Sequence, residues 1–489
     1  MIILDNITNK SGQTDFIDYV IKNYEKEDNP TFVNTCDGWD YYTSHNKIRD
    51  KVRKVIGIDA EGRPYTKTSD VLSNTQLTHN FYRKLVNQKV SYVLGRPFTI
   101  NQTKITDRTK ADTISKALEP YLDDTLYCEI QTAAADAIIG GMGWIYNYYK
   151  DGKIKFDRID PRQIIPIWKD AKHKVIDAII HKYLRYEFLS SGELKKIKCV
   201  DYYTTIGRTK YEYDISGKLV EVEKLTAYIN INGGIYNWDR MPWTWFKYSP
   251  SDECLLTNVK SLIDEYDFLE SCVSDIIKDS PNSYMVIKGY SAGSIEEFQR
   301  NANEYRKLFV QSDGGVDSLE TPLQVDQIKL QWEQIRKDIF EFGQGVDTIN
   351  TDLRDTSGAA LRHIYSDLDM DCSKWMTLLK QSIQNILYFI FVDIFLKTGK
   401  DYINANFDII FNTDIVINES ETVTNLMNSK DILPMKTLIA QSPYVVNAEE
   451  EYEEWKREQQ EKAQLEIEVD KATETKEVSN GKTDNTNNT

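Results

Sequence analysis

The sequence predicts an α+β fold whose two halves are organised differently. Over roughly the first 250 residues, short helical patterns alternate with strand-like segments rich in Tyr, Ile and Thr. From Cys254 onward, apolar residues recur at steps of three and four, which is typical of long amphipathic helices. Of the 489 residues, 40% are hydrophobic and 28% are charged, so the composition excludes a mainly disordered or collagen-like chain.

The first half begins with two predicted helices and a short strand. A helix over 73–94 ends at Gly95-Arg96-Pro97, where glycine can cap a helix and proline cannot continue one. A strand follows at 98–101, and a second helical pattern covers 109–139.

Glycines then separate this second helix from a predicted hairpin. Gly140-Gly141-Met142-Gly143 precedes two strands, 144–149 and 154–159, which the turn residues Lys-Asp-Gly-Lys connect. Such a glycine cluster can also cradle a phosphate, but it lacks the GxxxxGK[ST] frame and the strand-to-helix context, so a helix-to-strand break is favoured. Further strands are expected at 175–188, 197–205, 209–213 and 225–231.

Two helices of matched heptad period follow in the second half. They cover 255–280 and 324–342, and they bracket a compact insert, 281–323. Within the insert we expect a strand at 284–288, a helix at about 294–310 and a returning strand near 315–320. The apolar stripes of the two helices are Val259, Leu262, Tyr266, Leu269, Val273 and Ile276, and Ile328, Trp332, Ile335, Ile339, Phe342 and Val346.

A polar loop leads from these helices into a third, longer helix. The loop, 343–357, is long for a link between helices, and long loops are often functional. The helix after it would extend about 60 Å by Lys397, which suggests that it reaches across or between subunits. Strands are expected within 407–417 and helices within 420–470. The tail, 471–489, is nearly free of apolar residues and is expected to be disordered.

Charge and residue spacing exclude several classes of protein. The 60 basic residues against 76 acidic ones give a net charge of −16, which argues against tight nonspecific binding of DNA. No Cys or His spacing fits zinc, no GxSxG or SxxK motif places a catalytic serine, and no cofactor is indicated. The N-terminus lacks a signal-peptide pattern. The most apolar run, 386–396, is too short to span a membrane and is interrupted by Asp393.

Two clusters leave alternatives open. Asp367, Asp369 and Asp371 form a DxDxD run that could hold a metal, but alternate residues diverge on a helix, so a solvated flank is favoured. Trp238, Trp243 and Trp245 could stack on a ligand, although a core or subunit contact is favoured.

The order of these segments resembles the portal (head-to-tail connector) proteins of tailed bacteriophages, in the form found in siphophages of Gram-positive hosts. The similarity extends over about residues 40–465, and it depends on the order and spacing of several short segments. They are Asn80-Phe-Tyr-Arg-Lys-Leu-Val-Asn-Gln-Lys-Val-Ser-Tyr-Val-Leu-Gly-Arg-Pro97, Gly143-Trp-Ile-Tyr146, Asp160-Pro-Arg-Gln-Ile-Ile-Pro166, Thr356-Ser-Gly-Ala-Ala-Leu361 and Ile432-Leu-Pro-Met-Lys-Thr-Leu-Ile-Ala-Gln-Ser-Pro443, followed by acidic residues 449–454.

This resemblance implies a ring, usually of twelve subunits, at one capsid vertex. Residues 1–254 and 358–418 would form the wing, 255–280 and 324–342 the two stem helices, and 281–323 the clip. Residues 343–357 would be the tunnel loop at the narrowest part of a DNA channel, and 419–470 the helical crown.

The resemblance also implies partners and contact residues. The expected partners are the terminase large subunit, a head-completion adaptor, the major capsid and scaffolding proteins, and double-stranded DNA passing through the channel, with no membrane and no metal. The particle would assemble in the cytoplasm of the host bacterium. Expected contact residues are Gln344, Asp347, Asn350, Asp352 and Arg354 in the tunnel loop; Tyr284, Lys288, Arg300, Arg306 and Lys307 in the clip; and Leu262, Leu269, Trp332, Ile335 and Ile339 between subunits of the stem.

Two other functions are weighed against this one. A nucleic-acid-processing enzyme would use clustered carboxylates and a divalent metal, and no motif in the sequence supports it. A different structural protein of the virion, such as a minor capsid or baseplate component, is the main alternative.

Overall fold

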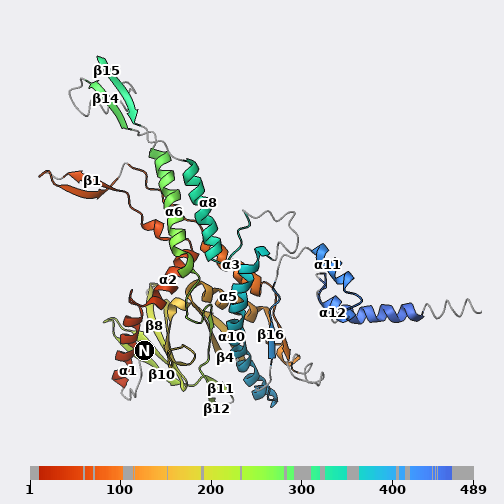
Figure 1. Cartoon of the computed structure of the whole chain (residues 1–489). Coiled ribbons are helices and arrows are strands. Elements are labelled where there is room, and N and C mark those ends of the chain that lie inside the picture. The colour runs from red at the N-terminus through yellow and green to blue at the C-terminus, as the bar shows by residue number, and fades with distance from the viewer. Residues whose placement is uncertain are drawn as a thin grey trace, which may run out of the picture. The chain divides into compact units, whose positions relative to one another are not determined.

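The computed structural model describes residues 10–58, 61–69, 72–102, 114, 116–150, 152–188, 192–231, 234–279, 284–290, 310–319, 325–349, 363–403, 407–413, 419–442, 444–445, 448 and 450–464. The chain divides into two compact units. The first comprises Met1–Asn350 and Tyr365–Asp414, and the second comprises Thr351–Ile364 and Ile415–Thr489. The fold is α+β, as expected (Figure 1).

The helices of the first unit come from the sequence both before and after residue 250. They are α1 (Lys10–Tyr24), α2 (Pro30–Tyr42), the short η1 (Lys47–Asp50), α3 (Phe81–Leu94), α5 (Asp124–Gly140), the short η2 (Pro161–Gln163), α6 (Leu256–Asp279), α8 (Val325–Phe342) and α10 (Ser366–Thr398).

Its strands form small antiparallel sheets. They are β1 (Lys54–Ile58), β2 (Pro64–Thr68), β3 (Thr99–Gln102), β4 (Met142–Lys150), β5 (Lys153–Ile159), β6 (Ile164–Trp168), β7 (Ile176–Phe188), β8 (Leu194–Thr204), β9 (Gly207–Tyr213), β10 (Leu219–Thr226), β11 (Ile229–Ile231), β12 (Gly234–Tyr236), β13 (Trp243–Lys247), β14 (Tyr284–Tyr290), β15 (Val310–Leu319) and β16 (Phe407–Ile410).

Two of these sheets pack face to face and carry an aromatic core between them. A five-stranded sheet in the order β10-β9-β8-β7-β6 lies against a three-stranded sheet in the order β13-β4-β5. Trp144 and Trp243, which are 2% and 0% exposed, fill the space between them. Helix α1 covers the other face of the five-stranded sheet, and α5 and α10 cover the other face of the three-stranded one. Trp243 and Trp238 are core residues, so the favoured interpretation of the tryptophan cluster holds for both.

The glycine cluster ends α5 and begins β4, as the sequence predicted. Helix α5 stops at Gly140, Gly141 takes φ of +92°, and β4 starts at Met142. A β-carbon on Gly143 would lie 1.8 Å from the carbonyl oxygen of Ala133, so this position requires glycine. The predicted hairpin is confirmed, with Lys150 paired to Lys153 at its turn.

Several predicted boundaries differ from those of the structure. The helix predicted at 109–139 is divided: residues 114 and 116–118 are helical, 119–121 form a turn, and α5 begins at Asp124, where the Asp123 side chain caps it by accepting the N–H of Leu126 at 2.8 Å. The segment predicted as one strand at 225–231 is divided between β10 and β11. The first predicted helix begins at Phe81 and not at 73, because 73–79 is an extended segment bound to α6.

Helix α10 is a core helix of its own chain. It begins at Ser366, has 33 residues and extends about 50 Å. Its length and composition would suit a membrane span, and it is the one such helix among the described residues, but more than half of its most apolar window is buried in the protein. The buried Asp393 accepts hydrogen bonds from Tyr121, Tyr149 and Lys397 at 2.8, 2.5 and 2.7 Å. The length of α10 therefore needs no second subunit to explain it.

The second unit is helical where it is described. It contains α11 (Glu419–Asn428), α12 (Met435–Ala440) and a helix over 450–464. The predicted helix at 294–310 and the tail 471–489 lie outside the described residues, apart from Val310, which begins β15.

Candidate functional site

A buried lysine on α3 joins the end of α8 to the start of α10. The side chain of Lys89 is fully buried, and its ammonium donates to a carboxylate oxygen of Asp371 at 2.6 Å and to the carbonyl of Gln344 at 3.1 Å. Tyr248 donates a further hydrogen bond to Asp371 at 2.7 Å. Since a buried charge is costly unless it is paired, this arrangement holds the first residues of the polar loop and the start of α10 against α3.

The neighbouring residue of α3 fixes the loop backbone. The Gln88 side chain donates to the carbonyl of Val346 at 2.7 Å and accepts the Val346 N–H at 3.1 Å. A β-carbon on Gly345 would lie 2.3 Å from a methyl of Leu85, so a larger residue here would force that buried side chain to shift. Gln344 takes a left-handed φ of +49°. The first residues of the loop are thus a fixed turn, which we call the loop anchor (residues 343–347).

Asp347 closes the loop anchor with an ion pair. Arg336 of α8 donates two hydrogen bonds to it, at 2.7 and 2.8 Å, and the Asp347 side chain is only 11% exposed. Burial raises the pKa of Asp347, but the Arg336 hydrogen bonds outweigh burial and hold it below its ordinary value. Gln344 and Asp347, expected to face DNA, are engaged within their own chain; Asn350, Asp352 and Arg354 lie outside the described residues.

The acidic run at the start of α10 belongs to the same region. Asp371 pairs with Lys89, and Asp369 accepts a hydrogen bond from Tyr92 at 2.7 Å. The favoured prediction of a solvated flank was therefore wrong for these two residues, because α3 packs alongside the helix and supplies their partners. The described residues contain no group of three or more His, Cys, Asp or Glu side chains that could hold a metal ion.

Helix α6 carries a second polar feature, a ladder of four side chains that binds an extended strap (residues 73–79). Each ladder residue accepts one backbone N–H of the strap, at alternate strap residues. The pairs are Asp279 with Ser73 at 3.0 Å, Asp275 with Thr75 at 2.6 Å, Ser271 with Leu77 at 2.9 Å, and Asp267 with His79 at 2.9 Å. Four helical residues rise about 6 Å and two extended residues about 6.6 Å, so the two repeats match over this length.

Basic residues of the segment before β1 complete the ladder. Lys51 and Arg53 contact Asp275 at 2.6 and 3.2 Å, and Arg53 also contacts Asp279 at 3.5 Å. Asn46 donates to Asp267 at 2.6 Å. The ladder therefore holds both segments that flank the β1–β2 hairpin, and it fixes them to α6.

We expect the strap to loosen in acid. Burial raises the pKa of Asp275, but hydrogen bonds from Lys51 and Thr75 outweigh it and lower the pKa to about 2, below the ordinary value of about 3.9. The ionised carboxylate is favoured in the folded state, so its stabilisation is complete above about pH 4 and is lost as the pH falls toward 2. Hydrogen exchange at the Thr75 and Leu77 amides, corrected for intrinsic rates, should accelerate over that interval. Unchanged protection would contradict this role.

The structure divides the five predicted stem contacts into two classes. Ile335 and Ile339 are 8% and 0% exposed, so they are covered within a single chain. Leu262, Leu269 and Trp332 are half-buried, and a role in subunit contacts stays a prediction for them.

The buried side of α6 does not follow the predicted apolar stripe. It runs through Val259, Ile263 and then the polar ladder, because the strap supplies hydrogen-bond donors there. Other apolar side chains of the two stem helices are left exposed. These are Phe268, Ile276 and Ile277 on α6 and Val325, Leu330 and Phe342 on α8, with Ile277 65% and Leu330 68% exposed.

The predicted clip residues are only partly described. Tyr284 and Lys288 lie on β14, which pairs with β15 in antiparallel register, with Lys288 opposite Gly315. Arg300, Arg306 and Lys307 lie outside the described residues.

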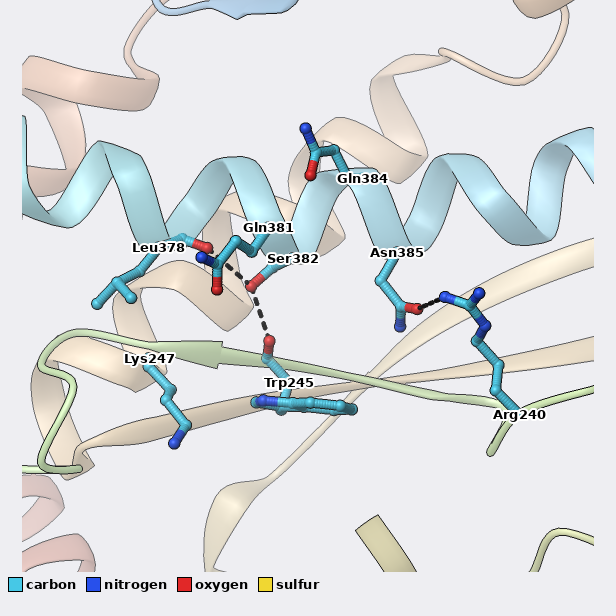
Figure 2. A pocket seen from close by; sticks show the side chains of 8 residues that line it. All are labelled: Arg240, Trp245, Lys247, Leu378, Gln381, Ser382, Gln384 and Asn385. Atoms are coloured by element: carbon cyan, nitrogen blue, oxygen red, sulfur yellow. Dashed lines mark hydrogen bonds between the residues drawn. The ribbon is translucent and has the colours of Figure 1, made fainter. Parts of the chain in front are cut away.

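A polar cavity of about 290 Å³ lies between β13 and α10. Figure 2 shows the residues that line it: Arg240, Trp245 and Lys247 on the strand side, and Leu378, Gln381, Ser382, Gln384 and Asn385 of α10. Arg240 donates to Asn385 at 3.1 Å, and Ser382 donates to the carbonyl of Trp245 at 2.7 Å. These contacts attach α10 to β13, and the cavity has no arrangement of a nucleophile and a base.

Sequence reasoning missed the two polar features. Lys89 gave no signal, because a lysine within an amphipathic pattern is usually solvated. The ladder did give a signal in the sequence. Its residues, Asp267, Ser271, Asp275 and Asp279, recur at steps of four, which places them on one side of a helix.

Comparison with known proteins gives one family over nearly the whole chain. The family model described as "Phage portal protein, SPP1 Gp6-like" matches residues 25–465. The portal protein of Bacillus phage SPP1 is 24% identical over 422 residues, which cover 84% of this chain and 80% of that protein. The portal protein of Clostridium phage phiCD119 is 21% identical over 449 residues, 82% of this chain and 94% of that protein.

The chain is also similar to solved structures. One of them is titled "Neck of empty GTA particle computed with C6 symmetry", and it is 8% identical with a TM-score of 0.40, covering 74% of this chain and 90% of that chain.

Proposed function

Because the chain belongs to the SPP1 Gp6-like phage portal protein family, a family of structural, non-enzymatic virion proteins, we propose that identical copies of it form a ring of about twelve subunits around a DNA channel. The ring sits at one capsid vertex and serves genome packaging, head-tail joining and DNA ejection. It assembles in the cytoplasm of the host bacterium.

The observation that carries this proposal is the apolar surface of the stem helices. Helices α6 and α8 pack side by side (Figure 1), yet Phe268, Ile277 and Leu330 remain exposed after that contact. Apolar side chains left exposed on both helices of a packed pair are candidates for contacts with neighbouring subunits. In a ring, the head-to-tail contact of neighbouring stems covers them, and the rotation between copies closes the assembly.

Replacing Ile277 with aspartate should block ring assembly without unfolding the chain. The side chain is exposed in the single chain, so the substitution costs little there, whereas in the stem contact it would bury an unpaired charge at a cost of several kcal/mol. Sedimentation velocity and negative-stain images should show folded subunits and no rings. Ile235→Asp, at an exposed position on β12, is the matched control and should still assemble. Normal rings from Ile277→Asp would contradict the stem assignment.

The same substitution at Leu269 or Ile335, two of the predicted stem contacts, is a weaker test of assembly. Ile335→Asp would not separate an assembly defect from unfolding, because the Ile335 side chain is buried inside the chain and a charge there would destabilise the fold itself. Leu269 is half-buried, so Ile277 is the better position.

The acidic character of the chain suits a channel through which DNA must move. Each phosphate that Lys or Arg neutralises adds affinity through counterion release, and several such contacts would slow translocation. A net charge of −16 per chain keeps the affinity of the ring for DNA low.

The segment roles follow the family organisation. We assign 1–254 and 358–418 to the wing, 255–280 and 324–342 to the stem, and 281–323 to the clip that meets the terminase large subunit and the head-completion adaptor. The loop 343–357 lines the channel, and 419–470 forms the crown. The major capsid and scaffolding proteins contact the outside of the ring.

The tunnel-loop role is best tested by a short deletion. Removing all of 343–357 would also remove the loop anchor and disturb α3, α8 and α10, so we choose to delete 351–357. Rings should still form, but DNA filling of phage heads should stop. Normal packaging by this deletion would contradict the loop's role. Deletion of 192–193, in the β7–β8 turn region, is the control and should package DNA.

A further inference from the structure

Helix α1 covers only part of the face of the sheet on which it lies. Ile17, Val20 and Ile21 pack on the β6, β7, β8 and β9 side chains that include Ile180 and Val200. Strands β7 and β8 continue as a two-stranded ribbon past this core, paired as far as Phe188 with Leu194. Because side chains alternate along a strand, the residues that continue the α1-covered face can be read from the register.

On this uncovered part of the face, apolar and basic residues form two parallel columns. Strand β7 contributes Leu184, Tyr186 and Phe188, which are 45%, 57% and 76% exposed. Opposite them on β8 lie Lys198, Lys196 and Leu194. Lys196 and Lys198 are exposed as well. The ribbon therefore presents an apolar column directly beside a basic one.

These two columns of the β7–β8 ribbon, which we call the strip, form one side of a groove of about 960 Å³ along the flank of α1. Asp18, Lys22 and Glu25 line it from the helix, and the strip residues Leu184, Tyr186, Lys196 and Lys198 line it from the sheet. Ile215, in the turn between β9 and β10, also lines it and is completely exposed. A groove beside a helix, with a sheet as its floor, has the shape that a second helix fills.

We propose that this groove binds an amphipathic, acidic helix of a partner protein, laid beside α1. The apolar column contacts the helix's apolar stripe, and Lys196 and Lys198 pair with acidic side chains on its flank. Successive rungs of the ribbon are about 6.6 Å apart and successive turns of a helix about 5.4 Å, so three rungs span about two to three turns. Helix α1 already binds the adjoining part of this face in the same manner.

The proposal is tested with a designed peptide as the probe. The probe is a fluorescent 18-residue helix with leucines at i, i+3, i+4 and i+7 and glutamates along one flank; a second peptide has lysine in place of each glutamate. Binding to the full-length assembled protein is followed by fluorescence anisotropy. The acidic peptide should bind saturably, and the double change Lys196→Glu with Lys198→Glu should weaken it about tenfold or more. Tyr186→Ser should weaken it as well.

The chain offers a matched control on the same strand. Lys195 is exposed but lies on the opposite face of the ribbon, across from Glu187 in the strand register, so Lys195→Glu should leave the affinity unchanged. Equal binding of the two peptides, no saturable binding of the acidic one, or full affinity in the Lys196/Lys198 variant would overturn the proposal.

A second copy of this chain is the alternative occupant, and labelling distinguishes it. In a Cys128→Ser background, which removes an exposed thiol, Tyr186→Cys should react with a maleimide in assembled particles made of this chain alone. Protection in those particles would show that a neighbouring copy covers the strip and would overturn the partner assignment. Because assembly is read separately from images, failure of this proposal is distinguishable from failure of the ring.

Discussion

Replacing Lys89 with methionine should lower the free energy of unfolding by about 3 to 5 kcal/mol, which is the usual cost of removing one partner of a buried ion pair. Methionine keeps most of the lysine's volume, so the loss reports the charge and its hydrogen bonds. The Asp371 carboxylate would keep its hydrogen bond from the Tyr248 hydroxyl but lose its cation, and the Gln344 carbonyl would lose the Lys89 donor. Urea unfolding at fixed protein concentration measures the change.

Two further variants make this prediction specific. Lys374→Met, on the exposed side of α10, should cost little. Adding Asp371→Asn to Lys89→Met should restore at least part of the stability, because the orphaned charge is removed while an acceptor for Tyr248 remains. Hydrogen exchange in 343–349 should rise in Lys89→Met. A double variant as unstable as the single one would show that the unpaired charge of Asp371 is not what destabilises Lys89→Met.

Asp275→Ala should be nearly as damaging, at about 3 kcal/mol. The carboxylate is fully buried and accepts from the Thr75 N–H, while Lys51 and Arg53 both pair with it. Its removal leaves two cations facing each other and one backbone donor without an acceptor. Asp275 lies between the other ladder residues, Ser271 and Asp279. Its loss should therefore reduce the protection from hydrogen exchange of amides along the whole strap.

The charge contribution of Asp275 can be separated from its hydrogen bond. Asp275→Asn keeps an acceptor for Thr75 and should cost less than the alanine change. A double-mutant cycle with Lys51→Met should give a coupling energy of about 1 kcal/mol or more. Glu265→Ala, at an exposed position of the same helix, is the control. A coupling near zero would mean that the ladder is held by its backbone bonds alone.

The sequence predicted those helices and strands whose apolar pattern lies within their own residues. The β4–β5 hairpin and the two stem helices follow directly from alternation, heptad spacing and glycine placement. Family resemblance, carried by the order of short segments, agrees with the family that the full-length comparison gives.

The sequence pattern could not predict which group each polar side chain binds. A helix with Asp267, Asp275 and Asp279 looks solvated until the strap, almost 200 residues earlier in the chain, is placed against it. The extended strap was predicted as part of a helix, because local propensity carries no information about donors satisfied by a distant helix. Lys89 was missed for the same reason, since Asp371 lies 282 residues away.

The central claim, that copies of this chain close into a hollow ring, is tested most directly by imaging the purified full-length protein in negative stain. We expect particles with rotational symmetry and a central hole, formed by the chain alone. A uniform population of folded monomers at high concentration, or particles without a hole, would contradict the account.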